Sequence, residues 1–149
     1  MLTDRQWKVF RPILSAAWRT YCARTGTVES DRIAKDKWYR QALVSSVGIF
    51  STKQVAPKDQ GMFDKLCLCF ATLSGDDKQI NYWSRAAERR AMWRLEQTMK
   101  KAAVSLQYVE GIARNMNFIF LYLEDLPAEH ILKINTAVYK HWKRKEHCA

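Results

Sequence analysis

The sequence predicts an all-α fold, a single compact domain of about six helices around one long central helix. Residues 77–106 contain no Gly and no Pro, and most of them tolerate helix well. Apolar residues recur in this stretch at steps of three and four, which is typical of one side of a helix. These inward-facing residues are Ile80, Trp83, Ala87, Ala91, Leu95, Met99, Ala102 and Leu106. Elsewhere the chain offers helix start and stop signals.

The first part of the chain contains two further helices. The capping-box pattern of residues 3–6 begins a helix that Gly26 ends. Pro12 lies inside this pattern, so we expect a kinked helix or two short helices that share a face. The next helix begins at residue 30 or 31 and ends at Gly48, because glycine readily takes the left-handed conformation after a helix.

The remaining elements lie on either side of the long helix. Residues 59–74 form a helix before it, and Ser105 caps a helix after it. Residues 118–123, with the sequence FIFLYL, are the one stretch of strand-like composition. Because a lone strand has no partner, we expect a buried helical or irregular core segment there. Pro127 begins the last helix, which ends in a cationic last turn.

The chain is strongly basic, with a formal charge of +10 over 149 residues. Residues 1–56 hold ten Lys and Arg against four Asp and Glu, residues 57–105 nine against six, and residues 106–149 six against five. Because the excess is spread along the chain, it favours a folded basic surface over a disordered arm. Such a surface attracts nucleic acid, an anionic membrane or an acidic protein, and the alternative is a basic surface that only confers solubility.

The sequence also indicates whether the protein is secreted or inserted in a membrane. The N-terminal residues are charged at Asp4 and Arg5, unlike a secretory signal. The longest apolar run, residues 118–123, is too short to span a bilayer. These features predict a cytoplasmic protein without membrane contact.

No pattern of catalytic or metal-binding residues emerges from the sequence. The four cysteines lack zinc-site spacing, so we expect buried, reduced thiols and no metal. A glycine-rich phosphate loop, HExxH and GxSxG are all absent, and Asp76 and Asp77 suit the start of a helix better than catalysis. The sequence therefore predicts a protein that is not an enzyme and that needs no cofactor.

Three segments resemble the GemA regulatory family of Mu-like phages. They are residues 38–55 (WYRQALVSSVGIFSTKQV), residues 108–116 (YVEGIARNM) and residues 126–132 (LPAEHIL). They lie within two parts of the chain, residues 36–75 and 107–145, that are similar to this family over about half of the sequence. In the family pattern, a Tyr-Arg pair opens a helix that ends in Gly, a Ser/Thr turn follows, and a Pro-started helix closes the pattern.

This resemblance implies a small phage or prophage protein that modulates host gene expression or DNA topology and has no assigned active site. Residues 1–30 and the long helix have no counterpart in the family pattern, so the target can differ.

The leading hypothesis is a regulatory protein that binds DNA or RNA non-enzymatically and without sequence specificity. Lys/Arg side chains on one helix face can follow a phosphate backbone, and aromatic rings among them can stack on bases. The candidate residues on the long helix are Lys78, Tyr82, Arg85, Arg89, Trp93 and Lys100. A second candidate cluster at the C-terminal end consists of Lys140, Lys143, Arg144 and Lys145.

Each candidate has a structural alternative. In one alternative, Tyr82 and Trp93 pack against the first or last helix, and in another the C-terminal cluster is a solvated helix end. A different class of function is a protein-interaction module, such as a phage inhibitor of an acidic host protein or a helical subunit of a larger nucleoprotein complex of the CRISPR or transposition type. That module would use the same basic surface for electrostatic steering.

Overall fold

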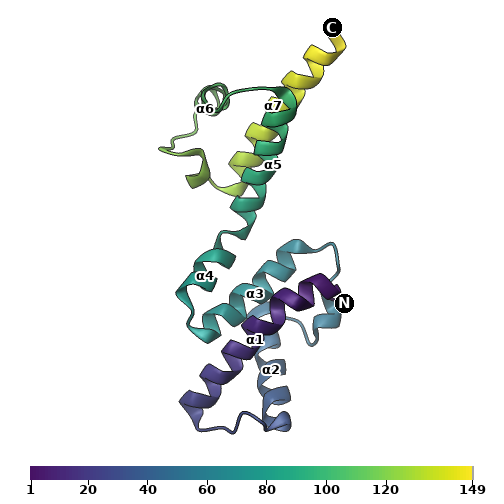
Figure 1. Cartoon of the computed structure of the whole chain (residues 1–149), viewed down its shortest axis with the longest axis vertical. Coiled ribbons are helices and arrows are strands. Elements are labelled where there is room, and N and C mark those ends of the chain that lie inside the picture. Colours follow the sequence, from purple (N-terminus) through teal and green to yellow (C-terminus); the bar gives the residue numbers. More distant parts are fainter. Residues whose placement is uncertain (149) are drawn as a thin grey trace. The chain divides into compact units, whose positions relative to one another are not determined.

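The computed structural model describes residues 1–148, and this range holds seven α-helices, two short 3-10 helices and no strand (Figure 1). The predicted all-α class is confirmed. Packing contacts divide the chain into two compact units, residues 1–84 (unit 1) and residues 85–149 (unit 2). No helix within residues 1–148 is both long enough and apolar enough to cross a membrane.

Unit 1 consists of four α-helices and one 3-10 turn. Their bounds are α1 Asp4–Thr25, α2 Arg32–Val47, η1 Thr52–Gln54, α3 Gln60–Ser74 and α4 Asp77–Ser84. The expected capping box at Thr3 begins α1, and left-handed glycines end α1, α2 and α3 as predicted. Pro12 lies inside α1, which nevertheless continues as one helix of 22 residues and is not divided into two.

Aromatic rings around α3 form the core of unit 1. Phe70 is fully buried, and its ring centroid lies 5.3 Å from that of Phe10, 5.7 Å from that of Trp38 and 5.7 Å from that of Tyr39. These rings come from α1 and α2, so α3 joins the helices of the unit. Edge-to-face and tilted ring pairs of this kind add to the stabilisation that burial provides.

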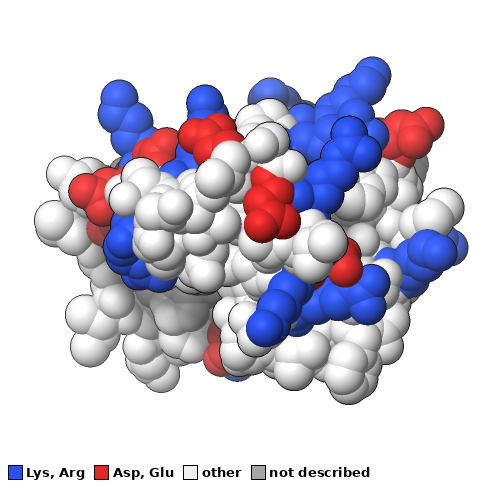
Figure 2. Space-filling view, turned by 90° about the horizontal axis from the view of Figure 1, so that it is seen from below, with Lys and Arg blue, Asp and Glu red and all other residues white. Residues whose placement is uncertain are grey.

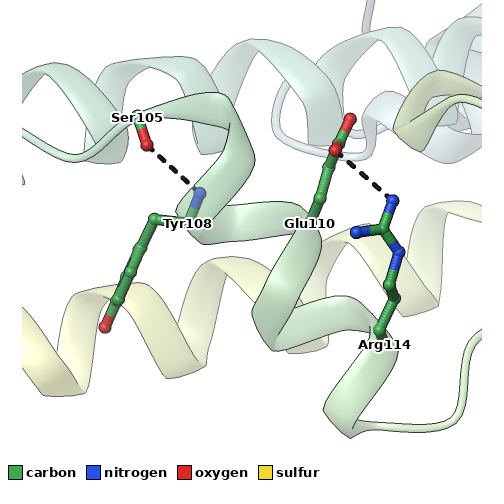
Figure 3. Close-up of polar contacts among 4 residues, drawn as sticks. All are labelled: Ser105, Tyr108, Glu110 and Arg114. Carbon is green, nitrogen blue, oxygen red and sulfur yellow. Dashed lines mark hydrogen bonds and ion pairs between the residues drawn. The ribbon is translucent and has the colours of Figure 1, made fainter.

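Unit 2 consists of α5 Ala86–Ala102, α6 Leu106–Asn115, η2 Leu123–Asp125 and α7 Ala128–Cys148. Its core lies between α5 and α7 and includes the fully buried Leu95, Ile131, Ile134 and Val138. Ser105 caps α6 as predicted, because its Oγ accepts a hydrogen bond of 3.2 Å from the Tyr108 N–H (Figure 3).

The helices α5 and α7 run in the same direction. At their N-terminal ends, Nη2 of Arg85 donates a 2.9 Å hydrogen bond to the backbone oxygen of Glu124, just before α7. Beyond the C-terminal end of α5, the ring of Tyr108 lies 5.5 Å from that of His141 on α7, and Figure 3 shows the Tyr108 side chain directed toward α7. The C-terminal ends of both helices therefore lie at the same end of unit 2, where α7 extends beyond α5 (Figure 1).

The predicted long helix over residues 77–106 is wrong. It is interrupted at Arg85, whose φ of −108° and ψ of 19° are not helical, and it ends at Ala102 before the left-handed Ala103. The predicted inward stripe therefore holds only in part. Trp83, Ala91 and Leu95 are buried and Ile80, Met99 and Ala102 are half-buried, whereas Ala87 and Leu106 are exposed.

The residues on the two sides of the interruption belong to different cores. Trp83 packs edge-to-face on Phe63 in unit 1, with ring centroids 5.8 Å apart, whereas Leu95 belongs to the core of unit 2. The Ser84 hydroxyl also donates to the Asn81 backbone oxygen at 3.0 Å, a local bond of the kind that bends helices. The stretch thus supplies two cores and not one.

The expectation that residues 118–123 are a buried core segment is wrong for three of the six, whereas Leu123 is buried in the core of unit 2 and Phe118 and Phe120 pack against it. The segment is irregular, and Ile119 is 97% exposed, Leu121 79% and Tyr122 61%. Phe118 is half-buried and stacks on His130 of α7, with ring centroids 4.1 Å apart. Only part of this apolar run therefore reaches the core.

We expect the double substitution Ile119→Ser/Leu121→Ser to leave the free energy of unfolding within about 0.5 kcal/mol of wild type, because exposed side chains contribute little to stability. Urea denaturation followed by circular dichroism measures this. A matched control is Ile131→Ser/Ile134→Ser, which places hydroxyls in the core of unit 2 and should destabilise it strongly. A large loss from the first pair would contradict the exposure of this segment.

Candidate nucleic-acid interface

The outer face of α5 combines cationic side chains with one aromatic ring. Leu95 faces the core of unit 2, and Trp93 lies on the opposite side of the helix, 61% exposed. We call this surface the basic face of α5. Its members are Arg89, Arg90, Trp93, Arg94, Lys100 and Lys101, of which Arg90 is half-buried and the others are exposed. Glu96 is the acidic residue exposed among them.

Helical spacing sets how far each cation of this face lies from Trp93. Arg89 and Arg90 precede it by four and three residues, so they lie on the adjacent turn, and Lys100 follows two turns later. The side chains of Arg94, Lys100 and Lys101 form no ion pair with any residue in the range 1–148. These three charges are therefore available to an external anion.

Two of the predicted site residues belong to a different unit. Lys78 and Tyr82 lie on α4 of unit 1, so they do not share a helix face with Arg89, Trp93 and Lys100. Tyr82 is 52% exposed and makes an edge-to-face contact with Trp83, with ring centroids 5.1 Å apart. The alternative in which Tyr82 and Trp93 pack inside the molecule does not hold, because more than half of each side chain is exposed.

Arg85 has a structural role that the sequence did not reveal. It stands just before α5, and its guanidinium donates to the backbone oxygen of Glu124 at 2.9 Å. Replacing Arg85 would release this contact at the start of α7 as well as remove a charge. Its substitution is therefore a poor test of nucleic-acid binding.

Sequence reasoning missed Arg90, Arg94 and Lys101, because it chose cations by their phase relative to Lys78 on an uninterrupted helix. The signal that would have found them is their placement around Trp93 within residues 86–102 alone.

The second predicted cluster lies on the last turns of α7. Lys140, Arg144 and Lys145 are exposed, and Lys143 pairs with Glu146 at 2.9 Å. The hydrogen bond to Glu146 raises the pKa of Lys143. The Lys143 Nζ lies 4.5 Å from the ring centroid of Trp142 and 6.0 Å from that of Tyr139, so this cluster too combines cations with aromatic rings.

Basic side chains also occupy other parts of the surface. Figure 2 shows separate groups of Lys and Arg on one face of the molecule, with Asp and Glu between them. Unit 1 contains thirteen Lys and Arg against eight Asp and Glu, and unit 2 twelve against seven. The two units thus have the same charge excess. The basic face of α5 has the more exposed ring of the two candidate clusters, since Trp93 is 61% exposed and Tyr139 is 47% exposed.

The cysteines have the character of interior thiols, except for the exposed Cys148. Burial, with a smaller effect from Asp64, raises the pKa of Cys67 to about 12. Burial also raises the pKa of Cys69. Both thiols stay protonated near neutral pH, which makes them poor nucleophiles and poor metal ligands. Residues 1–148 contain no group of three or more His, Cys, Asp or Glu side chains that could hold a metal ion.

Comparisons with known proteins gave no match: no family model, no curated protein and no solved structure matches the chain. The resemblance to the GemA family stays a prediction from the sequence. In the segment that carries it, α2 ends at Gly48 and Ser51 caps the following 3-10 turn, but Tyr39 and Arg40 lie within α2 and do not open it.

Proposed function

We propose that this protein is a small, basic, helical regulator of the phage or prophage type that binds nucleic acid without catalysing a reaction. The observation that carries the proposal is the basic face of α5, which combines the exposed Trp93 with the exposed cations Arg94, Lys100 and Lys101. Cations on one face can replace the counterions of a phosphate backbone, and this favours binding through counterion release. The sequence resemblance to GemA regulators supports the regulatory role.

The cations bind phosphates and therefore give affinity without sequence specificity. The C-terminal cluster of α7 supplies a second set of phosphate contacts, through Lys140, Arg144 and Lys145.

The proposal predicts binding to mixed-sequence oligonucleotides that weakens steeply with salt. We expect the logarithm of the association constant to fall linearly with the logarithm of the salt concentration, with a slope of about −2 to −5 for three to six phosphate contacts. Fluorescence anisotropy of labelled oligonucleotides, titrated between about 50 and 200 mM salt, measures this slope. If no DNA or RNA bound at the lowest salt, the proposal would be refuted.

A second candidate function is a protein-interaction module that docks on an acidic host protein. The observation that favours it is the exposed apolar segment at Ile119, Leu121 and Tyr122. Beside it, an open hollow of about 590 Å³ in unit 2 is lined by Met116, Phe118, Lys133, Thr136, Ala137 and Lys140. Apolar side chains rimmed by charge are typical of protein interfaces, and nucleic acid offers little to cover them. Failure to bind nucleic acid at low salt would favour this function.

A further inference from the structure

The exposed ring of Trp93 is accessible to a ligand that could cover it. An indole side chain that is mostly in water leaves a large apolar surface uncovered, which is uncommon for tryptophan. It lies on the side of α5 opposite the buried Leu95, so no element of unit 2 shields it. The ring therefore offers a flat apolar platform directed to solvent.

The surroundings of the platform indicate what the ligand carries besides a flat ring. Arg89 and Arg90 lie on the turn before Trp93, and Arg94 follows it directly. Farther along the helix, Lys100 lies about 10 Å from Trp93, at a rise of 1.5 Å per residue. A ligand stacked on the indole and extended toward the C-terminal end of α5 would therefore pass Arg94, Lys100 and Lys101. Alternating flat rings and anionic groups are the chemistry of a nucleic-acid strand.

Unpaired bases fit this surface better than a duplex does. In a double helix the faces of the bases are stacked on one another, so only base edges, sugars and phosphates are accessible to a helix. A ring on the surface of α5 gains stacking only from a base whose face is free. A duplex would contact the cations of this face and leave the indole without a stacking partner.

The C-terminal cluster on α7 has the same combination of groups. Tyr139 is exposed and Trp142 half-buried, and Lys143 lies over both rings. Unit 2 thus carries two separate sites at which cations and aromatic rings adjoin. Phosphate binding alone needs the cations and not the rings.

We propose that the nucleic acid bound by this protein is single-stranded, with an unpaired base stacked on Trp93 and the neighbouring phosphates held by Arg94, Lys100 and Lys101. This inference rests on the proposed function and narrows its ligand to a strand with accessible base faces. Single-stranded DNA and RNA share this chemistry, and they differ at the 2′-hydroxyl.

The test compares a mixed-sequence single-stranded DNA, the RNA of the same sequence and the corresponding DNA duplex, each titrated with the full chain at low salt. We expect the single strands to bind about tenfold or more tightly than the duplex. We expect Trp93→Ala to weaken single-strand binding about 5- to 100-fold, the range that the loss of one stacked base produces, and to leave duplex binding nearly unchanged. Trp93→Phe should retain most of the affinity because it keeps an aromatic face.

A matched control is Phe50→Ala, which removes an exposed ring that belongs to unit 1 and not to α5. It should leave all three affinities unchanged. Equal binding of single strand and duplex, or no effect of Trp93→Ala, would overturn this inference and leave the proposed function standing. Absence of binding to every oligonucleotide would overturn both. A difference between the DNA and RNA strands identifies the natural ligand class.

Discussion

The triple substitution Arg94→Gln/Lys100→Gln/Lys101→Gln is expected to weaken nucleic-acid binding about 10- to 100-fold at about 50 mM salt, because each lost phosphate contact removes one counterion-release contribution. These three side chains are exposed and form no ion pair with residues 1–148, so their replacement should not disturb the fold. The salt slope should become shallower by about 2. Anisotropy titrations at several salt concentrations measure both quantities.

The control for this variant removes the same charge from a different place. Arg32→Gln/Lys37→Gln/Lys58→Gln takes three exposed cations from unit 1 and gives the protein the same net charge. We expect it to lower affinity much less, since long-range attraction alone is weakened by screening. Equal losses in the two triple variants would show that only total charge matters and that the basic face of α5 is not the binding surface.

The substitution Trp83→Ala is expected to destabilise the protein by about 3–5 kcal/mol, through lost burial and the cavity that remains. Trp83 is buried against Phe63, and its Nε1 donates a 3.1 Å hydrogen bond to Oε1 of Gln79. A loss of this size is a large part of the stability of a typical domain, about 5–15 kcal/mol. Urea denaturation followed by circular dichroism tests it.

The chain offers a tryptophan control for this measurement. Trp93→Ala removes the same side chain from an exposed position ten residues later, so its effect on the unfolding free energy should stay within about 0.5 kcal/mol. If Trp83→Ala unfolded like wild type, the packing of α4 on α3 would be refuted. If Trp93→Ala were the more destabilising of the two, the orientation of α5 would be wrong.

Much of the fold could be predicted because local chemistry determines where helices begin and end. Thr3 and Ser105 accept hydrogen bonds from the first turns of their helices, and Gly26, Gly48 and Gly75 take the left-handed conformation that ends a helix. These residues act through neighbours within a few positions. The sequence alone therefore contains the information that places them.

The interruption at Arg85 could not be predicted in the same way. No Gly or Pro lies near it, and residues 77–106 read as one helix by composition and spacing. The interruption separates Trp83 from Leu95, which belong to different cores, and a local pattern of residues does not contain this division. Residues 118–123 were mispredicted for a related reason, since strand-like composition indicates apolar character but not which side chains find a core.

The candidate site, too, could be predicted only where it depends on local sequence. The sequence identified the basic and aromatic residues of α5 by type, including Trp93 and Lys100. It joined them to Lys78 and Tyr82 because it assumed an uninterrupted helix, and it left out Arg94 and Lys101. It also gave no sign that Arg85 is bonded to the backbone before α7, since that contact joins residues 39 positions apart.

The common direction of α5 and α7 has an electrostatic consequence. Each helix carries a partial negative charge at its C-terminal end, and in unit 2 these two partial charges lie at the same end. Lys100, Lys101 and the cations of the last turns of α7 lie near these partial negative charges. The helix ends therefore cancel part of the positive potential of these cations. Arg94, near the middle of α5, faces no such opposing dipole end. The potential along α5 is therefore more even than the number of cations at its C-terminal end would indicate.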